Sequence, residues 1–487
     1  MKFDLINLRN QNPWWKSKES INEEGKIKDY KKAEYRWNPR LKDNIDLNHD
    51  IIYTLRGPRQ VGKTTLVKLK IRDLLEKINE TERIFYYSCD LIDSKTDLTD
   101  LLNTYLDWIR EQTEERLYIF LDEISSVDNW QVGIKHLKDI GKLKNCTLLL
   151  TGSHSLDIEK SGETLPGRRG NGKQKNKILT PMKFAEYLEV AQSDLKPPKS
   201  FKTRKRQIIH LFKGQTDQFI QKLRPHLKDL DQKLNNYLKT GGFPKTINQF
   251  KTKGEIKYET YELYQSVIFG DIYKQNLERS SLRDIIQRVI ETRTSRVGWD
   301  TLKKNTSIKH HDTVKKYVET LEKSFVLNIL HKVNLNKKIP TTSAYKKIYF
   351  SDPFIFHSMR AWINGYSNPF KESSKALQKP DFKSKMVEEV VMGHLVRLAF
   401  NLQPSDHFDS KEQLFYWSNS KEIDFILKYK NRLYPVEVGY KEDIGGKGKW
   451  IEKRFRNSLT PILISKNQFE INEHYVIVPA SLFLFLI

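Results

Sequence analysis

The sequence predicts an α/β protein whose first large domain is a parallel sheet, followed by helical and mixed α+β domains. Between residues 49 and 180, short apolar runs alternate with amphipathic stretches, which is typical of parallel strands joined by crossover helices. The length of 487 residues leaves room for about three domains at roughly 150 residues each. Hydrophobic residues make up 38% of the chain and aromatic residues 11%, which excludes a wholly disordered protein.

Residues 1–48 are polar and rich in tryptophan, and we interpret them as a partly extended arm that packs its aromatic side chains on the next domain. The domain over 49–180 has four expected strands, at Ile51–Leu55, Ile84–Tyr87, Leu117–Leu121 and Thr147–Thr151. Residues 181–275 are expected to be mostly helical, with one turn at Thr240–Pro244.

Residues 276–340 show the order helix, short helix, helix and strand, which is the order of a winged helix. The last region, 341–487, is expected to be turn-rich over 353–382 and then to continue with a helix. Its expected strands lie at 414–418, 422–428, 433–438 and 474–478.

The charge is strongly basic, with 85 Lys and Arg against 61 Asp and Glu and a net charge of +24. Such an excess predicts attraction to phosphate polymers or acidic surfaces. Two cysteines, Cys89 and Cys146, exclude a disulfide framework or a cysteine zinc cluster. No apolar run follows the N-terminal charges, and the closing run Leu482–Ile487 is too short to span a bilayer. We therefore expect a cytoplasmic location and no membrane partner.

A phosphate-binding loop follows the first expected strand. The pattern GxxxxGK[ST] is met here, and a helix begins directly after it. Glycines permit a tight turn whose N–H groups point at phosphate oxygens, and the helix N-terminus favours negative charge. Lys63 is expected to reach the β- and γ-phosphates, and the Thr64 hydroxyl to bind Mg²⁺. The expected nucleotide-binding residues are Gly57, Pro58, Arg59, Gln60, Val61, Gly62, Lys63, Thr64 and Thr65.

Two acids, Asp122 and Glu123, end the apolar run that starts at Leu117. Asp122 is the expected partner of Mg²⁺, and Glu123 is expected to orient and deprotonate an attacking water. The additional strand between the two motifs and the second acid favour a hydrolysing ATPase over a small GTPase. No guanine-reading Asn-Lys-x-Asp motif occurs, so ATP is the expected nucleotide. A solvated strand end is the alternative interpretation.

Four further residues are candidates for the same site. Thr151 and Ser153 follow the next strand, and either could contact the γ-phosphate or its water; a simple turn is the alternative. Arg168 and Arg169 lie in a glycine-flanked loop and could complete the site of a neighbouring subunit in a homo-oligomer. A guanidinium suits that role because it can bridge two phosphate oxygens. A merely solvated basic loop is the alternative.

Together, the segments Gly57–Thr65, Leu121–Glu123 and Thr151–Ser155 resemble the archaeal ATPase branch of the AAA+ superfamily. The Asn12–Trp15 arm and the Gly241–Pro244 turn also recur in that group. The resemblance covers nearly the whole chain. It implies a P-loop ATPase sheet, a helical lid, a winged helix and a C-terminal domain similar to the PD-(D/E)xK nucleases.

For the C-terminal domain, the resemblance implies a nuclease-like site at Glu388, Asp424 and Glu437. Asp424 and Glu437, on adjacent strands, could hold a divalent cation through hard oxygen ligands. Gly439 stands where the family has its catalytic lysine. Lys441 lies on the same strand face if the strand continues that far, and is a poor substitute. We therefore expect weak or absent nuclease activity.

Three functions remain open from the sequence. The first is an ATP-hydrolysing switch or motor that acts on DNA; the second is a regulatory ATP-binding scaffold that assembles protein partners with little turnover. An ATP-regulated nuclease is the third and is disfavoured by Gly439. The expected DNA-contacting residues are Arg283, Lys303, Lys304, Lys309, Lys315 and Lys316. The alternative is that the winged helix only packs between domains.

Overall fold

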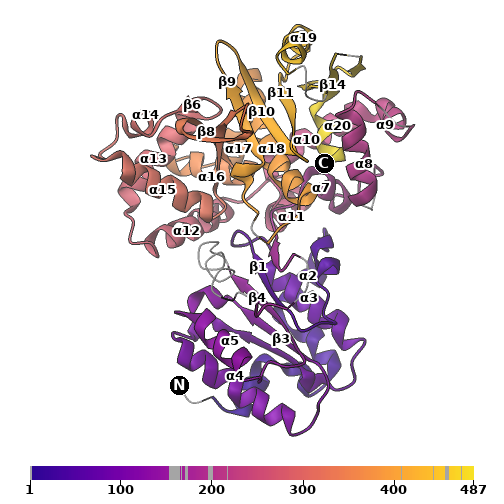
Figure 1. The fold of residues 1–487 in the computed structure, drawn as a ribbon, viewed down its shortest axis with the longest axis vertical. Helices are drawn as coiled ribbons and strands as arrows, with labels where there is room; N and C mark the ends of the chain where they lie inside the picture. Colours follow the sequence, from indigo (N-terminus) through magenta and orange to yellow (C-terminus); the bar gives the residue numbers. More distant parts are fainter. Residues whose placement is uncertain are drawn as a thin grey trace. The chain divides into compact units, whose positions relative to one another are not determined.

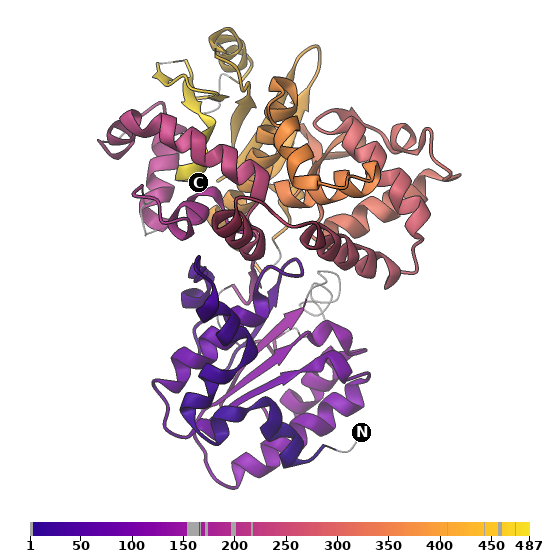
Figure 2. The same ribbon diagram turned by 180° about the vertical axis from the view of Figure 1, so that it is seen from behind.

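The computed structural model describes residues 3–152, 165, 167–170, 174–195, 201–215, 218–406, 408–442, 444–455, 460–472 and 474–487. The chain forms two compact units (Figures 1 and 2). The N-terminal unit comprises Met1–Thr180 with Ser405–His407, and the C-terminal unit comprises Pro181–Pro404 with Phe408–Ile487. The predicted α/β fold class is confirmed by the sheet of the first unit.

The sheet of the N-terminal unit has five strands, all parallel, in the order β2-β3-β4-β1-β5. The strands are β1 Ile52–Arg56, β2 Ile84–Ser88, β3 Leu117–Asp122, β4 Cys146–Gly152 and β5 Asn176–Ile178. The first four coincide with the expected strands to within about a residue, whereas the three-residue β5 was not expected. Because β4 separates β1 from β3, the carboxyl ends of three adjacent strands meet beside the phosphate loop.

Helices cover both faces of this sheet (Figures 1 and 2). The main ones are α3 Lys63–Leu75, α4 Lys95–Arg110 and α5 Trp130–Asp139, with short 3₁₀ turns at η4 Thr81–Arg83, η5 Cys89–Leu91 and η6 Ile124–Ser126. The three internal strands, β3, β4 and β1, are buried throughout, as expected for a parallel sheet with helices on both sides.

The N-terminal arm is helical rather than partly extended, which corrects that prediction. Its elements are α1 Leu5–Gln11, η1 Pro13–Trp15, η2 Lys18–Glu23, α2 Gly25–Lys32 and η3 Arg40–Asn44. The indole N–H groups of Trp14 and Trp15 both donate to the carbonyl of Ile84 at 2.9 Å. The Asn12 amide bonds the backbone N–H and C=O of Tyr86 at 2.7 and 3.0 Å. The arm thus satisfies the free edge of β2, which would otherwise expose unpaired backbone groups.

The C-terminal unit begins with helices, as the sequence predicts. They are α7 Phe184–Val190, α8 Phe201–Leu211, α9 Gln218–Leu223, η7 Arg224–His226, α10 Leu227–Thr240, α11 Pro244–Lys253 and α12 Tyr258–Tyr273. The turn between α10 and α11 packs directly on Asp352. A Cβ atom on Gly241 would lie 1.9 Å from Asp352 Oδ1, and the Gly242 N–H donates to Asp352 Oδ2 at 2.8 Å. Glycine is required there because the carboxylate leaves no room for a side chain.

The next region has the expected order of helix, short helix, helix and strand. It consists of α13 Arg279–Thr292, β6 Arg296–Val297, α14 Trp299–Lys303, α15 His311–Lys323, β7 Leu327–Asn334 and β8 Ile339–Phe350. Apolar stripes on α13 and α15 are buried, so both helices form as amphipathic elements around one core. The strands β7 and β8 pair as an antiparallel hairpin, with β6 on the far side of β8.

Residues 353–382 are helical, and the turn-rich stretch predicted there is wrong. The helices are α16 Pro353–Asn364, α17 Pro369–Ala376 and the start of α18 Pro380–Leu402. Each begins with proline, and the side chains of Asp352 and Asn368 cap the first two. These residue types mark helix starts as well as turns, because proline suits the first helical position and Asp or Asn the N-cap.

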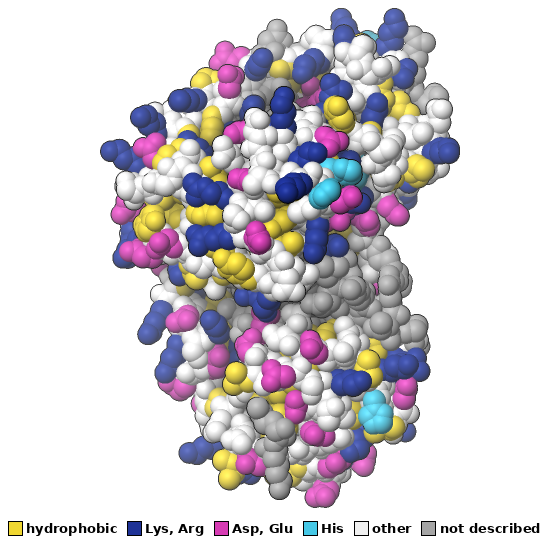
Figure 3. Space-filling view, turned by 90° about the vertical axis from the view of Figure 1, so that its left-hand side faces the viewer, with side chains coloured by type: hydrophobic (Ala, Val, Ile, Leu, Met, Phe, Trp, Pro, Cys, Tyr) yellow, Lys and Arg dark blue, Asp and Glu magenta, His cyan; other side chains and the backbone are white. Residues whose placement is uncertain are grey.

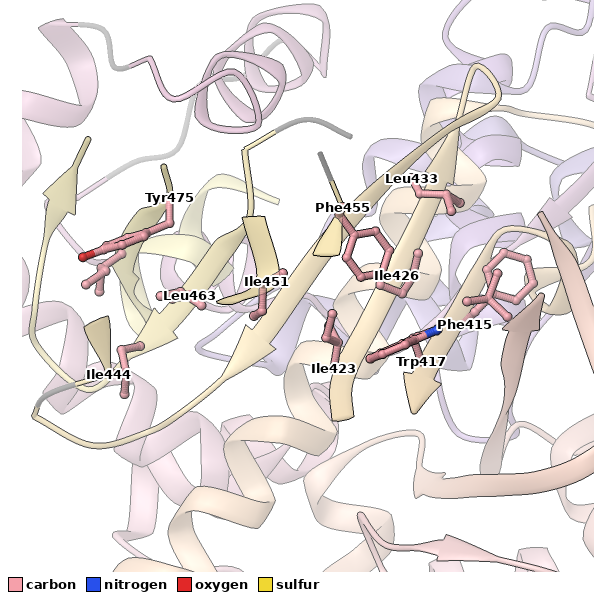
Figure 4. Packing of buried hydrophobic residues seen from close by; sticks show 12 residues of the cluster. Phe415, Trp417, Ile423, Ile426, Leu433, Ile444, Ile451, Phe455, Leu463 and Tyr475 are labelled. Atoms are coloured by element: carbon pink, nitrogen blue, oxygen red, sulfur yellow. The ribbon is translucent and has the colours of Figure 1, made fainter. Parts of the chain in front are cut away.

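The remaining strands extend the hairpin into one sheet. They are β9 Leu414–Ser418, β10 Glu422–Tyr429, β11 Arg432–Val438, β12 Ile462–Ser465, β13 Glu470–Ile471 and β14 Val476–Pro479, with η8 Ser410–Glu412 before them and α19 Gly445–Arg454 between β11 and β12. The order is β13-β14-β12-β11-β10-β9-β7-β8-β6, and the parallel pair β7–β9 makes the join. Apolar side chains from these strands and from α19, including Phe415, Ile426 and Ile451, pack over one another (Figure 4). The regions 276–340 and 341–487 therefore share a sheet, and residue 340 falls inside β8.

The apolar C-terminal run forms α20 Ala480–Leu486 and is buried in the C-terminal unit against α10, α7 and α18. Lys183 Nζ donates to the Ile487 carbonyl at 2.8 Å and holds the end of the run in place. Within the described part of the chain, no helix has the length and apolar character needed to cross a membrane.

Candidate active site

The phosphate loop joins β1 to α3, and two glycines make its turn possible. A Cβ atom on Gly57 would lie 2.0 Å from the carbonyl oxygen of Leu179. The N–H of Leu179 donates to the backbone carbonyl of Arg56 at 2.8 Å. Gly62 has φ 105° and precedes α3, in the left-handed region that favours glycine. All nine expected nucleotide-binding residues lie in this loop or in the first turn of α3.

Lys63 is buried and faces the loop from the first turn of α3. Its Nζ atom donates to the carbonyl oxygens of Gly57 and Pro58 at 3.0 and 3.2 Å. The ammonium is therefore held inside the curve of the loop, where the N-terminus of α3 also favours negative charge. This geometry suits contact with phosphate oxygens, which would replace the two carbonyl acceptors.

Asp122 lies at the end of β3 and is 3% exposed. Three hydroxyl groups donate to its carboxylate: Thr64 at 2.7 Å, Tyr86 at 3.2 Å, and Thr151. The two expected Mg²⁺ ligands, Thr64 and Asp122, are thus in direct contact. Hydroxyl and carboxylate oxygens are hard ligands of the kind Mg²⁺ prefers, so the residues present fit this cation.

Glu123 follows β3 directly and has a left-handed backbone with φ 52°. Its N–H donates to Thr151 Oγ1 at 3.1 Å, and the residue is partly exposed. A non-glycine residue in this conformation costs about 1–3 kcal/mol and is common at functional sites. Thr151 therefore positions both acids from the neighbouring strand β4. Ser153, the other candidate after this strand, lies outside the described residues.

Tyr86 and Lys68 form a second layer behind Asp122, and the sequence analysis did not identify either. Lys68 Nζ lies 3.2 Å from the centroid of the Tyr86 ring and 3.7 Å from Glu24 Oε1. Burial lowers the pKa of Lys68 to about 8, partly opposed by the charges of Glu24 and Asp122. Burial and the nearby Asp122 together raise the pKa of the Tyr86 hydroxyl, which keeps it a donor. The spacing in the sequence could have pointed to Lys68, because it follows Thr64 by one helical turn and therefore lies on the same face of α3.

The two candidate arginines serve their own unit. The buried guanidinium of Arg169 donates to Ile52 O at 3.2 Å, Asn176 Oδ1 at 2.7 Å and Thr54 Oγ1 at 3.2 Å. It holds β5 to β1, and its burial contradicts the predicted contact with a neighbouring subunit's nucleotide. Arg168 is half-buried and donates to Asp139 on α5 at 2.5 Å.

The three acids of the expected nuclease-like site come together in the C-terminal unit. Asp424 on β10 faces Glu437 on β11: the Asp424 N–H donates to Glu437 Oε2 at 3.2 Å, and the Val438 N–H donates to Asp424 Oδ2 at 3.0 Å. Glu388 on α18 accepts a hydrogen bond from the Tyr349 hydroxyl at 2.8 Å. With Glu422 on β10, these acids are called the carboxylate cluster below.

Two lysines absent from the expected motif pair with the carboxylate cluster. Lys347 on β8 lies among Glu388, Glu422 and Asp424, and Lys447 on α19 pairs with Glu437. Burial opposes the charge of Lys347, but the surrounding acidic groups hold its pKa well above the usual value. Burial and the neighbouring Asp424 raise the pKa of Glu388 and of Glu437. No sequence spacing predicts these partners, because they come from another strand and another helix.

Lys441 does not lie on the strand face predicted for it, because β11 ends at Val438. A Cβ atom on Gly439 would lie 2.7 Å from Ile444 Cγ2, so a lysine at 439 would require Ile444 to move. Among the described residues, no group of three or more His, Cys, Asp or Glu is arranged to hold a metal ion. The divalent cation expected at Asp424 and Glu437 stays a prediction.

Comparisons with known proteins agree with the geometry of the first site. Residues 49–188 match the family model of an AAA domain, while 231–365 and 383–483 match domains of unknown function (DUF8612 and DUF4143). An uncharacterized protein of Methanocaldococcus jannaschii is 26% identical over 401 residues, which cover 80% of this chain and 74% of that protein. One from Haemophilus influenzae is 20% identical over 407 residues, covering 80% and 83%.

Among solved structures, the Walker-type ATPase of Pyrococcus abyssi aligns with a TM-score of 0.38 and 14% identity, over 64% of this chain and 91% of that one. The matches beyond residue 188 name no function, so the winged-helix and nuclease-like interpretations stay predictions. Residues 49–188 thus match an AAA domain model and contain the phosphate loop and most of the parallel sheet described above.

Proposed function

We propose that this protein binds ATP with Mg²⁺, hydrolyses it to ADP and phosphate, and couples that cycle to DNA. One observation carries the ATPase proposal: the Thr64 and Thr151 hydroxyls both donate to the Asp122 carboxylate, and Thr151 also accepts from the backbone N–H of Glu123. The side chains that would hold the cation and activate the water are thus assembled by three adjacent elements of one domain.

In this proposal, the loop amides and Lys63 bind the phosphates and Lys63 offsets the negative charge that develops on them. Thr64 and Asp122 hold Mg²⁺, which neutralises charge on the phosphate oxygens when bound. Glu123 orients a water and accepts its proton, since a carboxylate beside a nucleophile can act as a general base. The Thr151 hydroxyl links the Asp122 carboxylate to the backbone N–H of Glu123.

The DNA part of the proposal rests on the region from α13 to β8, which we take as a winged helix. Lys304, Lys309 and Lys316 are exposed around α14 and α15. Figure 3 looks onto the side of the C-terminal unit that carries these helices, and Lys and Arg side chains are spread over it with some acidic ones between them. Of the other expected contacts, Arg283 donates to Ile363 O at 2.8 Å and Lys303 pairs with Asp300 at 3.6 Å, so both are engaged within the fold.

ATP hydrolysis by the full-length protein, measured alone and with single-stranded, duplex or branched DNA, tests the proposal. We expect turnover that requires Mg²⁺, is lost in Lys63→Ala, and changes when one form of DNA is added. Turnover that no nucleic acid alters would favour the regulatory scaffold instead. A parent protein that binds ATP yet shows no turnover under any of these conditions would contradict hydrolysis as its function.

The DNA-binding face has its own test, with a charge-matched control. Each lost phosphate contact should reduce the slope of log K against log salt by about 0.9. We expect K304A/K309A/K316A to reduce that slope by two to three times this amount, with DNA binding measured by fluorescence anisotropy. The triple variant K26A/K77A/K144A removes three exposed lysines from the N-terminal unit and should leave the slope unchanged. Equal changes of slope in the two triple variants would show that DNA binding is not confined to the face around α14 and α15.

A further inference from the structure

An ammonium group lies where the nuclease-like motif leads one to expect a divalent cation. Lys347 Nζ is 2.6 Å from Glu422 Oε1, 2.8 Å from Asp424 Oδ1 and 3.3 Å from Glu388 Oε1. The side chain is 1% exposed and reaches the cluster from β8, between 41 and 77 positions away in the chain from its acceptors. A lysine ammonium has three donors, and three carboxylates lie around it.

The remaining oxygens of the central acids are also engaged. Asp424 Oδ2 accepts from the Val438 N–H, and Glu437 accepts from the Asp424 N–H through Oε2 and from Lys447 through Oε1. Mg²⁺ needs oxygen ligands at about 2.0–2.1 Å in near-octahedral geometry. The Lys347 ammonium fills the space between the carboxylates from which such ligands would have to come.

We propose that Lys347 is the permanent cation of this cluster, so that the C-terminal domain is held together by an internal charge network and binds no catalytic metal. The ammonium joins three elements that are distant in sequence: the hairpin strand β8, the strand β10 and the helix α18. Removing one partner from such a buried group leaves an uncompensated charge, so the network rigidly ties the hairpin to the rest of the sheet. This inference does not depend on nucleotide hydrolysis.

Binding of Mn²⁺ to the full-length protein without nucleotide, measured by electron paramagnetic resonance, tests the proposal. The Asp122→Asn background silences the expected cation site of the N-terminal unit. In that background, adding Asp424→Asn should leave Mn²⁺ binding unchanged. Neither Mn²⁺ nor EDTA should change the thermal midpoint of the protein. One equivalent of Mn²⁺ that is lost in Asp424→Asn would overturn the proposal, as would Mn²⁺-dependent cleavage of plasmid DNA that Asp424→Ala abolishes.

Lys347→Met removes the ammonium but keeps the length of the side chain. We expect this variant to have a lower thermal midpoint and to gain Mn²⁺ binding, with Mn²⁺ raising the midpoint by about 5 °C or more. The gain should disappear in Lys347→Met/Asp424→Asn. A folded Lys347→Met protein that binds no Mn²⁺ would show that the ammonium is not what excludes the cation. If the variant does not fold, the measurements on the chain with Lys347 intact still decide the question.

Discussion

Two buried aspartates, one in each unit, differ in the charge of the groups that donate hydrogen bonds to them. Asp122 and Asp424 are 3% and 9% exposed, and both lie on strands beside a second acid. Hydroxyl groups of Thr64, Thr151 and Tyr86 donate to Asp122, whereas the ammonium of Lys347 donates to Asp424. Neutral donors orient a carboxylate without cancelling its charge, so Asp122 can attract a cation. An ammonium cancels the charge, so Asp424 already has its cation.

The tyrosine and lysine near each aspartate also differ in their arrangement between the two units. The Tyr86 hydroxyl donates to Asp122, and the Tyr349 hydroxyl donates to Glu388. In the N-terminal unit the nearest lysine of this layer, Lys68, lies over the face of the Tyr86 ring. In the C-terminal unit the lysine lies among the carboxylates themselves. The strand position of an acid therefore indicates where a site can be, and the charge of its neighbours decides what the site binds.

Substituting each of the two aspartates by alanine should have the largest effects. One substitution should reduce ATP turnover, and the other should reduce stability. Asp122→Ala should lower ATP turnover by about a hundredfold or more, because Mg²⁺ loses its only expected carboxylate ligand; each tenfold corresponds to about 1.4 kcal/mol. Asp424→Ala should leave turnover within about twofold but destabilise the protein by about 3–5 kcal/mol, since it leaves Lys347 buried beside fewer acids.

Turnover and urea unfolding of both proteins measure this pair of effects. The comparison fails if Asp424→Ala lowers turnover as much as Asp122→Ala does in protein that is still folded.

Exchanging the second acids for glutamine should sharpen the comparison. Glu123→Gln should reduce turnover by about 10²–10⁴-fold while ATP still binds, because only the base that activates water is lost. Glu437→Gln is the matched control and should change neither ATP binding nor turnover. A fluorescent ATP analogue and a phosphate-release assay measure the two quantities. Turnover at the parent rate in Glu123→Gln would show that another group is the base.

The tyrosines should give the smallest effect. Tyr86→Phe removes one hydrogen bond to Asp122, which is worth about 0.5–1.5 kcal/mol, and should raise the Mg²⁺ concentration for half-maximal turnover by about two- to tenfold. Tyr349→Phe removes the equivalent bond to Glu388 and should leave that concentration unchanged. A magnesium titration of turnover checks both. An unchanged Mg²⁺ requirement in Tyr86→Phe would show that the Tyr86 hydroxyl does not position Asp122.

Local patterns predicted the elements that carry the nucleotide site. The four main strands of the N-terminal sheet, the phosphate loop and the placing of Asp122 and Glu123 follow from apolar runs and motif spacing, because each is decided within a few residues. The helices α16 and α17 were missed because Pro, Asn and Asp mark helix starts as well as turns. The helical N-terminal arm was missed because its short helices are stabilised by contacts with β2 rather than by their own sequence.

The sequence by itself determined which chemistry the chain can offer: a phosphate loop, two acids after a buried strand, and acids at 388, 424 and 437. Only the tertiary structure decided what surrounds each of them. Arg169 was expected at a neighbouring subunit and is buried between β1 and β5, and Lys347 reaches Asp424 from 77 positions away in the chain. The physical reason is that a charge acts through space, so the partner that neutralises a carboxylate need not be near it in sequence.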